Sequence, residues 1–259
     1  MEDDDRPHYL ALLRSLELIE PWLKRMDPES GRMQPGARSP LLGDDNRLHP
    51  YETSHATWHS LSHAVDHLHL LQTVLRDARV IHMYAPYSLI RGALENAAAA
   101  VWMLEPSARS GRLVRRMRLA AADIRNGEKA KELIGHTGPR PLQGRLDDLR
   151  KIAANEALDE KQALARVGYE EIVREAGRHT IAGDVLACLV WKVSSGIAHG
   201  DLWTTLNVSD RMELPGAPPG IAHLRITANM EMLKTCVAIT IEMTALGWHL
   251  LDMRSRSPY

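Results

Sequence analysis

The sequence has almost no net charge and very few cysteines. Lysine and arginine number 32 against 33 aspartates and glutamates, a formal net charge of -1. The chain as a whole therefore attracts neither nucleic acid nor an anionic membrane, and a site for a polyanion must be a local patch. The two cysteines, Cys188 and Cys236, each lie in an apolar helical run. Their placement predicts buried, reduced thiols and excludes a disulfide framework.

Long hydrophobic runs are also missing. No stretch of about 18 uninterrupted apolar residues occurs. The acidic start, MEDDDRPHYL, lacks the basic and apolar regions of a secretory signal. Phenylalanine is absent and arginine outnumbers lysine, a bias that is associated with GC-rich bacterial genomes. We therefore expect a bacterial, cytoplasmic protein with no membrane partner.

What the sequence does contain is helical periodicity. Apolar residues recur at helical spacing between breaks rich in proline and glycine, which predicts one all-α domain over residues 1–259, a bundle of about seven helices. Residues 27–51 lack periodicity, so we expect a long loop that is a covering segment or partly disordered. Residues 210–221 should form a Pro/Gly-rich loop. The segment DLWTTLNV, residues 201–208, is compatible with an extended chain.

Histidine recurs at every fourth position of a helix expected at residues 53–79, as His55, His59, His63 and His67. Each step of four residues turns about 40° around the helix, so neighbouring pairs could share a metal ion but all four could not. His59 and His63 with a carboxylate such as Glu95 would make a divalent-metal site, and Asp66 could orient an imidazole. The other interpretations are imidazoles hydrogen-bonded within a core or groove, and pH sensing.

A charged pair, Arg91 and Glu95, occurs in a helix expected at residues 86–105, with Trp102 on nearly the same face. Most flanking residues are apolar, so the pair should be partly buried, where its desolvation must be offset by partners. The pair is therefore a site candidate, and Trp102 is a candidate ligand contact. The alternative is that Glu95 only anchors the arginine and a neighbouring helix.

The third cluster lies in WKVSSGIAHGDLW, residues 191–203. Ser195 and His199 share one helical face, and Lys192 precedes the histidine by seven positions. On a purely structural interpretation, His199 occupies the last turn of a helix that Gly200 ends, where the helix dipole favours a protonated imidazole.

On a functional interpretation, His199 joins Arg91 and Glu95 in a polar pocket. Ser194 or Ser195 would then donate hydrogen bonds to a ligand. A Ser-His-carboxylate hydrolase is disfavoured, because nothing in the sequence resembles a strained nucleophile elbow.

At this point the chain resembles a known group. RGALE in one apolar helix and VSSGIAHG in a later one are similar to bacterial helical proteins placed near the HEPN superfamily, especially an actinobacterial group with a helix end of the WMLEP type. The resemblance implies an all-helical fold and, in members with ribonuclease activity, cleavage of RNA without a metal by an arginine and a histidine on one helix, commonly across a dimer. It covers residues 86–104 and 186–203.

Carried over by position, the resemblance makes His199 the catalytic histidine and Arg91 with Glu95 its supporting charged pair. Lys192 stands where that group has arginine, and lysine lacks the planar fork that grips a phosphate at two points. Nucleotide or ligand binding without cleavage is therefore an alternative to ribonuclease activity.

A basic patch is expected on the helix that follows. Its members are Arg109, Arg112, Arg115, Arg116, Arg118 and Arg125. They could contact RNA phosphates, or form a solvated face paired with acidic residues elsewhere.

Three functional hypotheses remain open. The first is a metal-independent, ribonuclease-like HEPN relative that acts on or binds RNA or nucleotides without a cofactor, with His199 as general base and Arg91 or Lys192 stabilising phosphate charge. The second is a non-catalytic bundle that binds a small molecule or a protein partner, including a second copy of the chain. The third is an enzyme dependent on a divalent metal at His59 and His63.

Overall fold

The computed structural model describes residues 5–30 and 33–257, so the acidic residues 1–4 lie outside the described part. The fold is all-α, with 71% of residues in helices and 4% in strands. The described residues hold eleven α-helices of seven residues or more together with the four-residue helix α8. The expected number of about seven was too low, because several breaks in the periodicity enclose short helices rather than loops.

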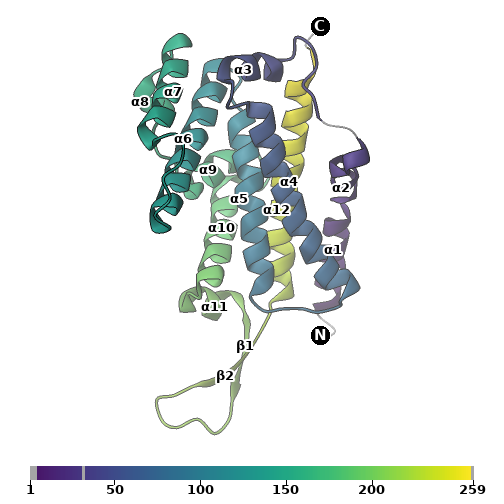
Figure 1. Ribbon diagram of the computed structural model, residues 1–259. Coiled ribbons are helices and arrows are strands. Elements are labelled where there is room, and N and C mark those ends of the chain that lie inside the picture. The colour runs from purple at the N-terminus through teal and green to yellow at the C-terminus, as the bar shows by residue number, and fades with distance from the viewer. Residues whose placement is uncertain (1–4, 31–32, 258–259) are drawn as a thin grey trace.

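The centre of the bundle is α5, and other helices pack around it (Figure 1). Thirteen of its twenty residues are buried. Its run Ala97–Ala100 allows close approach, as expected: a methyl group added at Gly247 would lie 3.6 Å from the Ala100 Cβ. The helices that surround α5 (Ala85–Leu104) are α4 (Thr53–Gln72), α9 (Tyr169–Gly177), α10 (Gly183–His199) and α12 (Met230–Ser255).

Two groups of shorter helices flank this centre (Figure 1). The helices α1 (Asp5–Glu17) and α2 (Glu20–Met26) lie on one side. On the other side a second hydrophobic cluster, which includes Leu113, Met117 and Leu149, joins α6 (Arg109–Leu133), α7 (Leu142–Asn155) and α8 (Glu160–Ala163). Leu48, the last residue of α3 (Pro40–Leu48), belongs to the same cluster.

Three segments differ from expectation. Residues 27–51 are not a loop throughout, because they contain the 3-10 turn η1 (Pro28–Ser30) and the helix α3 (Pro40–Leu48). The segment 201–208 is the helix α11 (Leu202–Val208) rather than an extended chain. Residues 210–221 begin with a strand, and the antiparallel hairpin formed by β1 (Asp210–Leu214) and β2 (His223–Thr227) projects away from the bundle (Figure 1).

The helix expected at residues 53–79 is confirmed as α4 followed by a π-helical turn, η2 (Thr73–Asp77). Both cysteines are buried and free, as expected. The helix α12 is long and apolar enough to cross a membrane by length and composition, and 61% of its most apolar window is buried inside the protein. A helix buried in the core of a protein can have the same length and composition.

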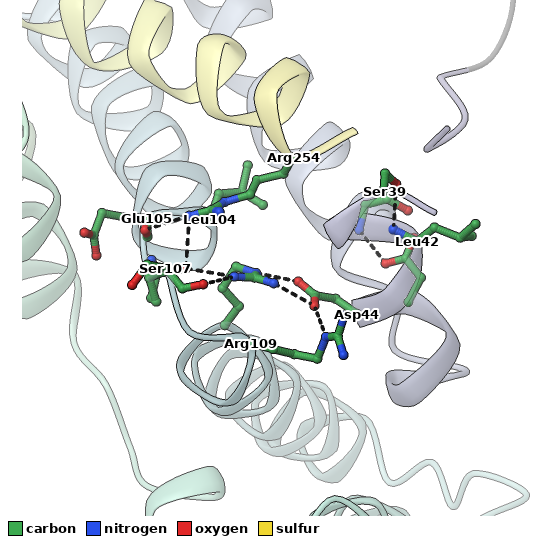
Figure 2. Close-up of polar contacts among 12 residues, drawn as sticks. Ser39, Leu42, Asp44, Leu104, Glu105, Ser107, Arg109 and Arg254 are labelled. Atoms are coloured by element: carbon green, nitrogen blue, oxygen red, sulfur yellow. Dashed lines mark hydrogen bonds and ion pairs between the residues drawn. The ribbon is translucent and has the colours of Figure 1, made fainter. Parts of the chain in front are cut away.

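A buried polar joint ties α3 to the end of α5 (Figure 2). Asp44 of α3 is fully buried and accepts two hydrogen bonds from Arg112, at 2.6 and 2.9 Å, and a third from Arg109. Arg112 and Arg254 donate to carbonyl oxygens within residues 104–107. The Leu104 carbonyl belongs to the last turn of α5, and the other three lie in the connection to α6. The guanidinium groups supply hydrogen-bond donors to these backbone acceptors.

Candidate functional site

The structure brings Arg91, Glu95 and His199 together. Nε of Arg91 donates to Oε1 of Glu95 at 2.9 Å, and Nη1 of the same arginine lies 2.9 Å from Nε2 of His199. Arg91 comes from the first half of α5 and His199 from the last turn of α10, 108 positions later in the chain. The predicted meeting of guanidinium, carboxylate and imidazole is therefore present.

An arginine has only donors, so a hydrogen bond between these two atoms makes Nε2 of His199 the acceptor. The imidazole is exposed, which leaves it open to a ligand. In this group an exposed imidazole nitrogen therefore lies next to a guanidinium cation that is held by Glu95.

Local sequence explains why His199 lies at the end of its helix. Gly200 has a φ of 77°, in the left-handed region that glycine adopts without steric cost. The amide of Asp201 then donates to the carbonyl of Gly196 at 2.8 Å, which ends α10. Gly196 also allows α11 to pack closely, because a Cβ there would meet Thr204 at 2.4 Å.

Two residues of this site were not predicted, Trp191 and Tyr169. The indole Nε1 of Trp191 donates to the same Oε1 of Glu95 at 2.8 Å, so Glu95 is held from two helices. Trp191 precedes His199 by eight residues, a spacing that places both on one helical face and could have revealed it.

Tyr169 begins α9, a separate helix, and no local signal in the sequence links it to the site. Burial, followed by the charge of Glu95, raises the pKa of Tyr169, while Arg91 acts in the opposite direction. Its phenol therefore stays protonated at neutral pH and can donate a hydrogen bond.

Lys192 is directed to a carboxylate rather than to the histidine. Its Nζ donates to Glu170 at 2.9 Å and lies 5.7 Å from the ring centroid of Trp191. Within the described residues it forms no hydrogen bond with His199. The cation expected to stabilise phosphate next to His199 is therefore Arg91, and Lys192 is occupied in the free protein.

The two serines differ in access. Ser194 is fully buried and its Oγ has no hydrogen-bond partner, so its hydroxyl cannot contact a ligand unless the helices move. The expectation that Ser194 binds a ligand is at odds with this burial. Ser195 is half-buried and remains a candidate donor.

Trp102 belongs to another part of α5. It is 1% exposed and donates to Glu175 at 2.6 Å. Eleven residues of helix place it about 16 Å along the axis from Arg91, and Arg115 stacks on its ring at 5.1 Å. The structure therefore separates Trp102 from the group around His199.

The histidine stripe faces outward. His55, His59 and His63 are exposed, so none of these three lies in the core. His55 does line a surface pocket and has its Nδ1 3.6 Å from Oε2 of Glu52. The rings of His59 and His63 lie 4.1 Å apart between centroids. Partial burial and the charges of His59 and His67 lower the pKa of His63, and Asp66 opposes this shift.

His67 differs from the other members of the stripe because it packs against α5. A Cβ on Gly92 would meet its ring at 2.5 Å, and its Nδ1 pairs with the carbonyl of His63 at 2.7 Å. No group of three or more potential metal ligands occurs in the described ranges 5–30 and 33–257. Glu95, which the metal hypothesis needs as a ligand, is bound by Arg91 and Trp191 instead.

The arginines of α6 are mostly used within the fold. Arg109 and Arg112 bind Asp44, Arg115 pairs with Glu105 and Glu175, and Arg118 pairs with Glu171. The expected alternative of a paired face therefore describes this half of the helix. Arg125 donates only to a backbone carbonyl, that of Leu164.

Comparison with family models, with curated proteins and with solved structures finds no similar protein.

Proposed function

We propose that the chain binds single-stranded RNA at the group formed by Arg91, Glu95 and His199, and cleaves it without a metal. The observation that carries the proposal is the 2.9 Å contact between Nη1 of Arg91 and the exposed Nε2 of His199. The Arg91 guanidinium, which can bind a phosphate, and the His199 imidazole, which can act as a base, are close enough to contact the same nucleotide. The resemblance of the two helices to HEPN sequences supports the same assignment.

The chemistry follows from the donors and acceptors present. A backbone phosphate takes the place of His199 as the partner of Arg91 Nη1, which frees Nε2. The imidazole then accepts the proton of the ribose 2′-hydroxyl, and the 2′-oxygen forms a bond to phosphorus while the bond to the 5′-oxygen breaks. Water supplies the proton to the leaving oxygen. The products are a 2′,3′-cyclic phosphate and a 5′-hydroxyl end.

Glu95 acts through Arg91. Because Oε1 accepts from both Arg91 and Trp191, it fixes the guanidinium in the orientation that faces His199. Glu95 is therefore a positioning residue, and it balances the charge of Arg91 when no phosphate is bound.

Replacement of His199 by alanine tests the proposal. Cleavage of a single-stranded RNA oligonucleotide in the presence of EDTA should fall by about 10²- to 10⁴-fold, the usual contribution of a general base, with an unchanged thermal melting curve. His59→Ala, which removes an exposed imidazole on α4, is the matched control and should cleave normally. Mass spectrometry should find cyclic phosphate ends. Equal cleavage by the His199→Ala variant would contradict the assignment.

A second candidate function is RNA or nucleotide binding without cleavage. The contact between Lys192 and Glu170 favours it, because within the described residues the cation hydrogen-bonded to His199 is Arg91 and not Lys192. In that case the wild-type protein binds the oligonucleotide and yields no product, and His199→Ala changes affinity alone.

We propose also that the chain pairs with a second copy through the outer face of α10. Val185, Leu186 and Leu189 are 73%, 37% and 50% exposed on this helix. Leu202 and Trp203, just beyond the His199 end, are 68% and 52% exposed. A row of exposed apolar side chains of this length marks an interaction surface. Its continuity with the site suits a symmetric pair in which two sites lie next to each other.

A further inference from the structure

A small cavity lies between α6 and the segment that leads into α9. Its volume is about 180 Å³, and it is lined by Ala122, Arg125, Asn126, Lys129, Arg166 and Val167. The four lining residues from α6 recur at steps of three and four, so they occupy one face of that helix.

Three cations line this cavity and no carboxylate does. Within ranges 5–30 and 33–257, none of Arg125, Lys129 and Arg166 has an ion-pair partner. Of the acidic residues on or near this part of α6, Glu171 pairs with Arg118 and Glu128 with Lys131 and Arg145, whereas Asp123 and Glu132 form no described ion pair and do not line the cavity. The lining itself therefore carries a formal charge of about three, and like charges that share a small cavity repel.

The walls of the cavity are held in place by arginines of α6. Arg118 donates to the carbonyl oxygen of Arg166 at 2.8 Å, and Arg125 donates to that of Leu164 at 3.0 Å. The segment 164–166 is thus fixed against α6 at both ends. Nη1 of Arg125 is buried and has no hydrogen-bond partner, and an unsatisfied buried donor is the kind of group that a bound ion or water accounts for.

We propose that this cavity binds a phosphate group. Its volume of about 180 Å³ is below the range of about 300–1,000 Å³ that holds whole small molecules, so one tetrahedral oxyanion is the group that fits inside it. Two guanidinium groups bind phosphate oxygens in pairs, and a lysine adds a point charge. A carboxylate ligand has one negative charge and two oxygens in one plane, so it would leave most of the N–H donors of the cavity without a partner.

The phosphate has two possible sources, a free phosphate group or the backbone of the RNA strand. The second source rests on the proposed function. Arg166 stands three residues before Tyr169, so their Cα atoms lie within about 11 Å of each other. The charges of Glu95 and Arg91 act on Tyr169, so the start of α9 lies between the cavity and the candidate site. On this proposal, an RNA strand bound at His199 extends toward the cavity.

The test uses the full chain and the double variant Lys129→Gln with Arg166→Gln. Neither side chain makes a described hydrogen bond, so the fold should be kept, whereas Arg125 supports the Leu164 carbonyl and stays unchanged. Lys151→Gln with Lys161→Gln removes the same charge from exposed positions and is the matched control. Inorganic phosphate is titrated by calorimetry, and single-stranded RNA binding is measured over a range of salt concentrations.

The wild type and the control should bind phosphate at one site, and the double variant should bind it about tenfold or more weakly. If the source is RNA, the double variant also loses RNA affinity and its salt slope falls by about 1.4, from two lost contacts at about 0.7 each. Unchanged RNA binding with lost phosphate binding assigns the cavity to a free phosphate group. Absence of phosphate binding by the wild type, or equal binding by the double variant, would overturn the proposal.

The phosphate-binding measurement does not depend on whether the proposed function is correct. His199→Ala leaves the cavity intact, so it should bind inorganic phosphate as the wild type does. Normal cleavage by that variant would remove the catalytic assignment and leave the phosphate cavity standing.

Discussion

At the scale of single residues, Asp44 shows how a buried charge is tolerated in this fold. Its carboxylate has no contact with water, and three donated hydrogen bonds from two arginines satisfy it (Figure 2). Arg112 is itself buried, and its remaining donors face carbonyl oxygens. The buried charges of Asp44 and Arg112 therefore stabilise each other.

Asp44→Ala should lower the free energy of unfolding by about 3–5 kcal/mol, because it leaves the Arg112 guanidinium buried and without a counter-charge. Urea denaturation followed by circular dichroism measures the change. Asp77→Ala breaks an exposed pair with Arg76 and should leave the midpoint almost unchanged. A loss no larger than that of the Asp77 variant would show that the joint contributes little.

The sequence was informative about some residues of the site and silent about others. Arg91, Glu95 and His199 could be selected because charged groups in apolar helices need partners, and those partners are now seen to be one another. The sequence could not show that Lys192 is held by Glu170, since the contact depends on how α9 packs against α10. For the same reason the burial of Ser194 could not be distinguished from the half-exposure of its neighbour Ser195.

At the scale of elements, the position of α9 against α10 sets the geometry of the site. Tyr169 and Glu170 come from one helix and Trp191, Lys192 and His199 from the other. The two helices are in tight contact at Gly177, where a Cβ would lie 2.8 Å from that of Ala187 and 3.0 Å from backbone atoms of α10. Backbone atoms cannot move aside as easily as the end of a flexible side chain can. This contact therefore fixes the distance between α9 and α10 at Gly177.

Gly177→Ala should therefore separate α9 from α10 and destabilise the protein by about 1–3 kcal/mol, the usual cost of overpacking. Thermal melting measures the stability. Gly127→Ala is the control: Gly127 lies inside α6 with nothing within 4 Å of an added Cβ, so alanine there should stabilise by about 0.5–1 kcal/mol. The interpretation fails if both variants gain stability.

The long helices were predictable as elements, and the short ones were not. The helices α4 and α5 have several turns of apolar periodicity, and they match the helices expected at residues 53–79 and 86–105. The helix α3 has nine residues and sits in a segment rich in proline and glycine, so its pattern is too brief to detect. In the hairpin nearly every residue is exposed, and a strand without a buried face shows no alternation.

At the scale of the whole molecule, the exposed face of α10 bears on the proposed pairing of two chains. We expect a mass of twice 29.0 kDa in sedimentation equilibrium. Leu189→Glu places a charge in the centre of that face and should give a single chain, since burying an unpaired carboxylate is costly. Leu133→Glu alters an apolar residue that is 89% exposed at the end of α6 and should not. A single chain in the wild type would contradict the pairing.

The hydrogen bond from Trp191 to Glu95 has a practical consequence. An indole that donates to a carboxylate changes its fluorescence when the field around that carboxylate changes. Any anion that draws Arg91 away from Glu95 must alter that field, whether or not a reaction follows. The chain has six tryptophans, so the part of the fluorescence change that a Trp191→Phe variant loses is the part that reports on this site. With that comparison, unlabelled compounds can be screened before a substrate is known.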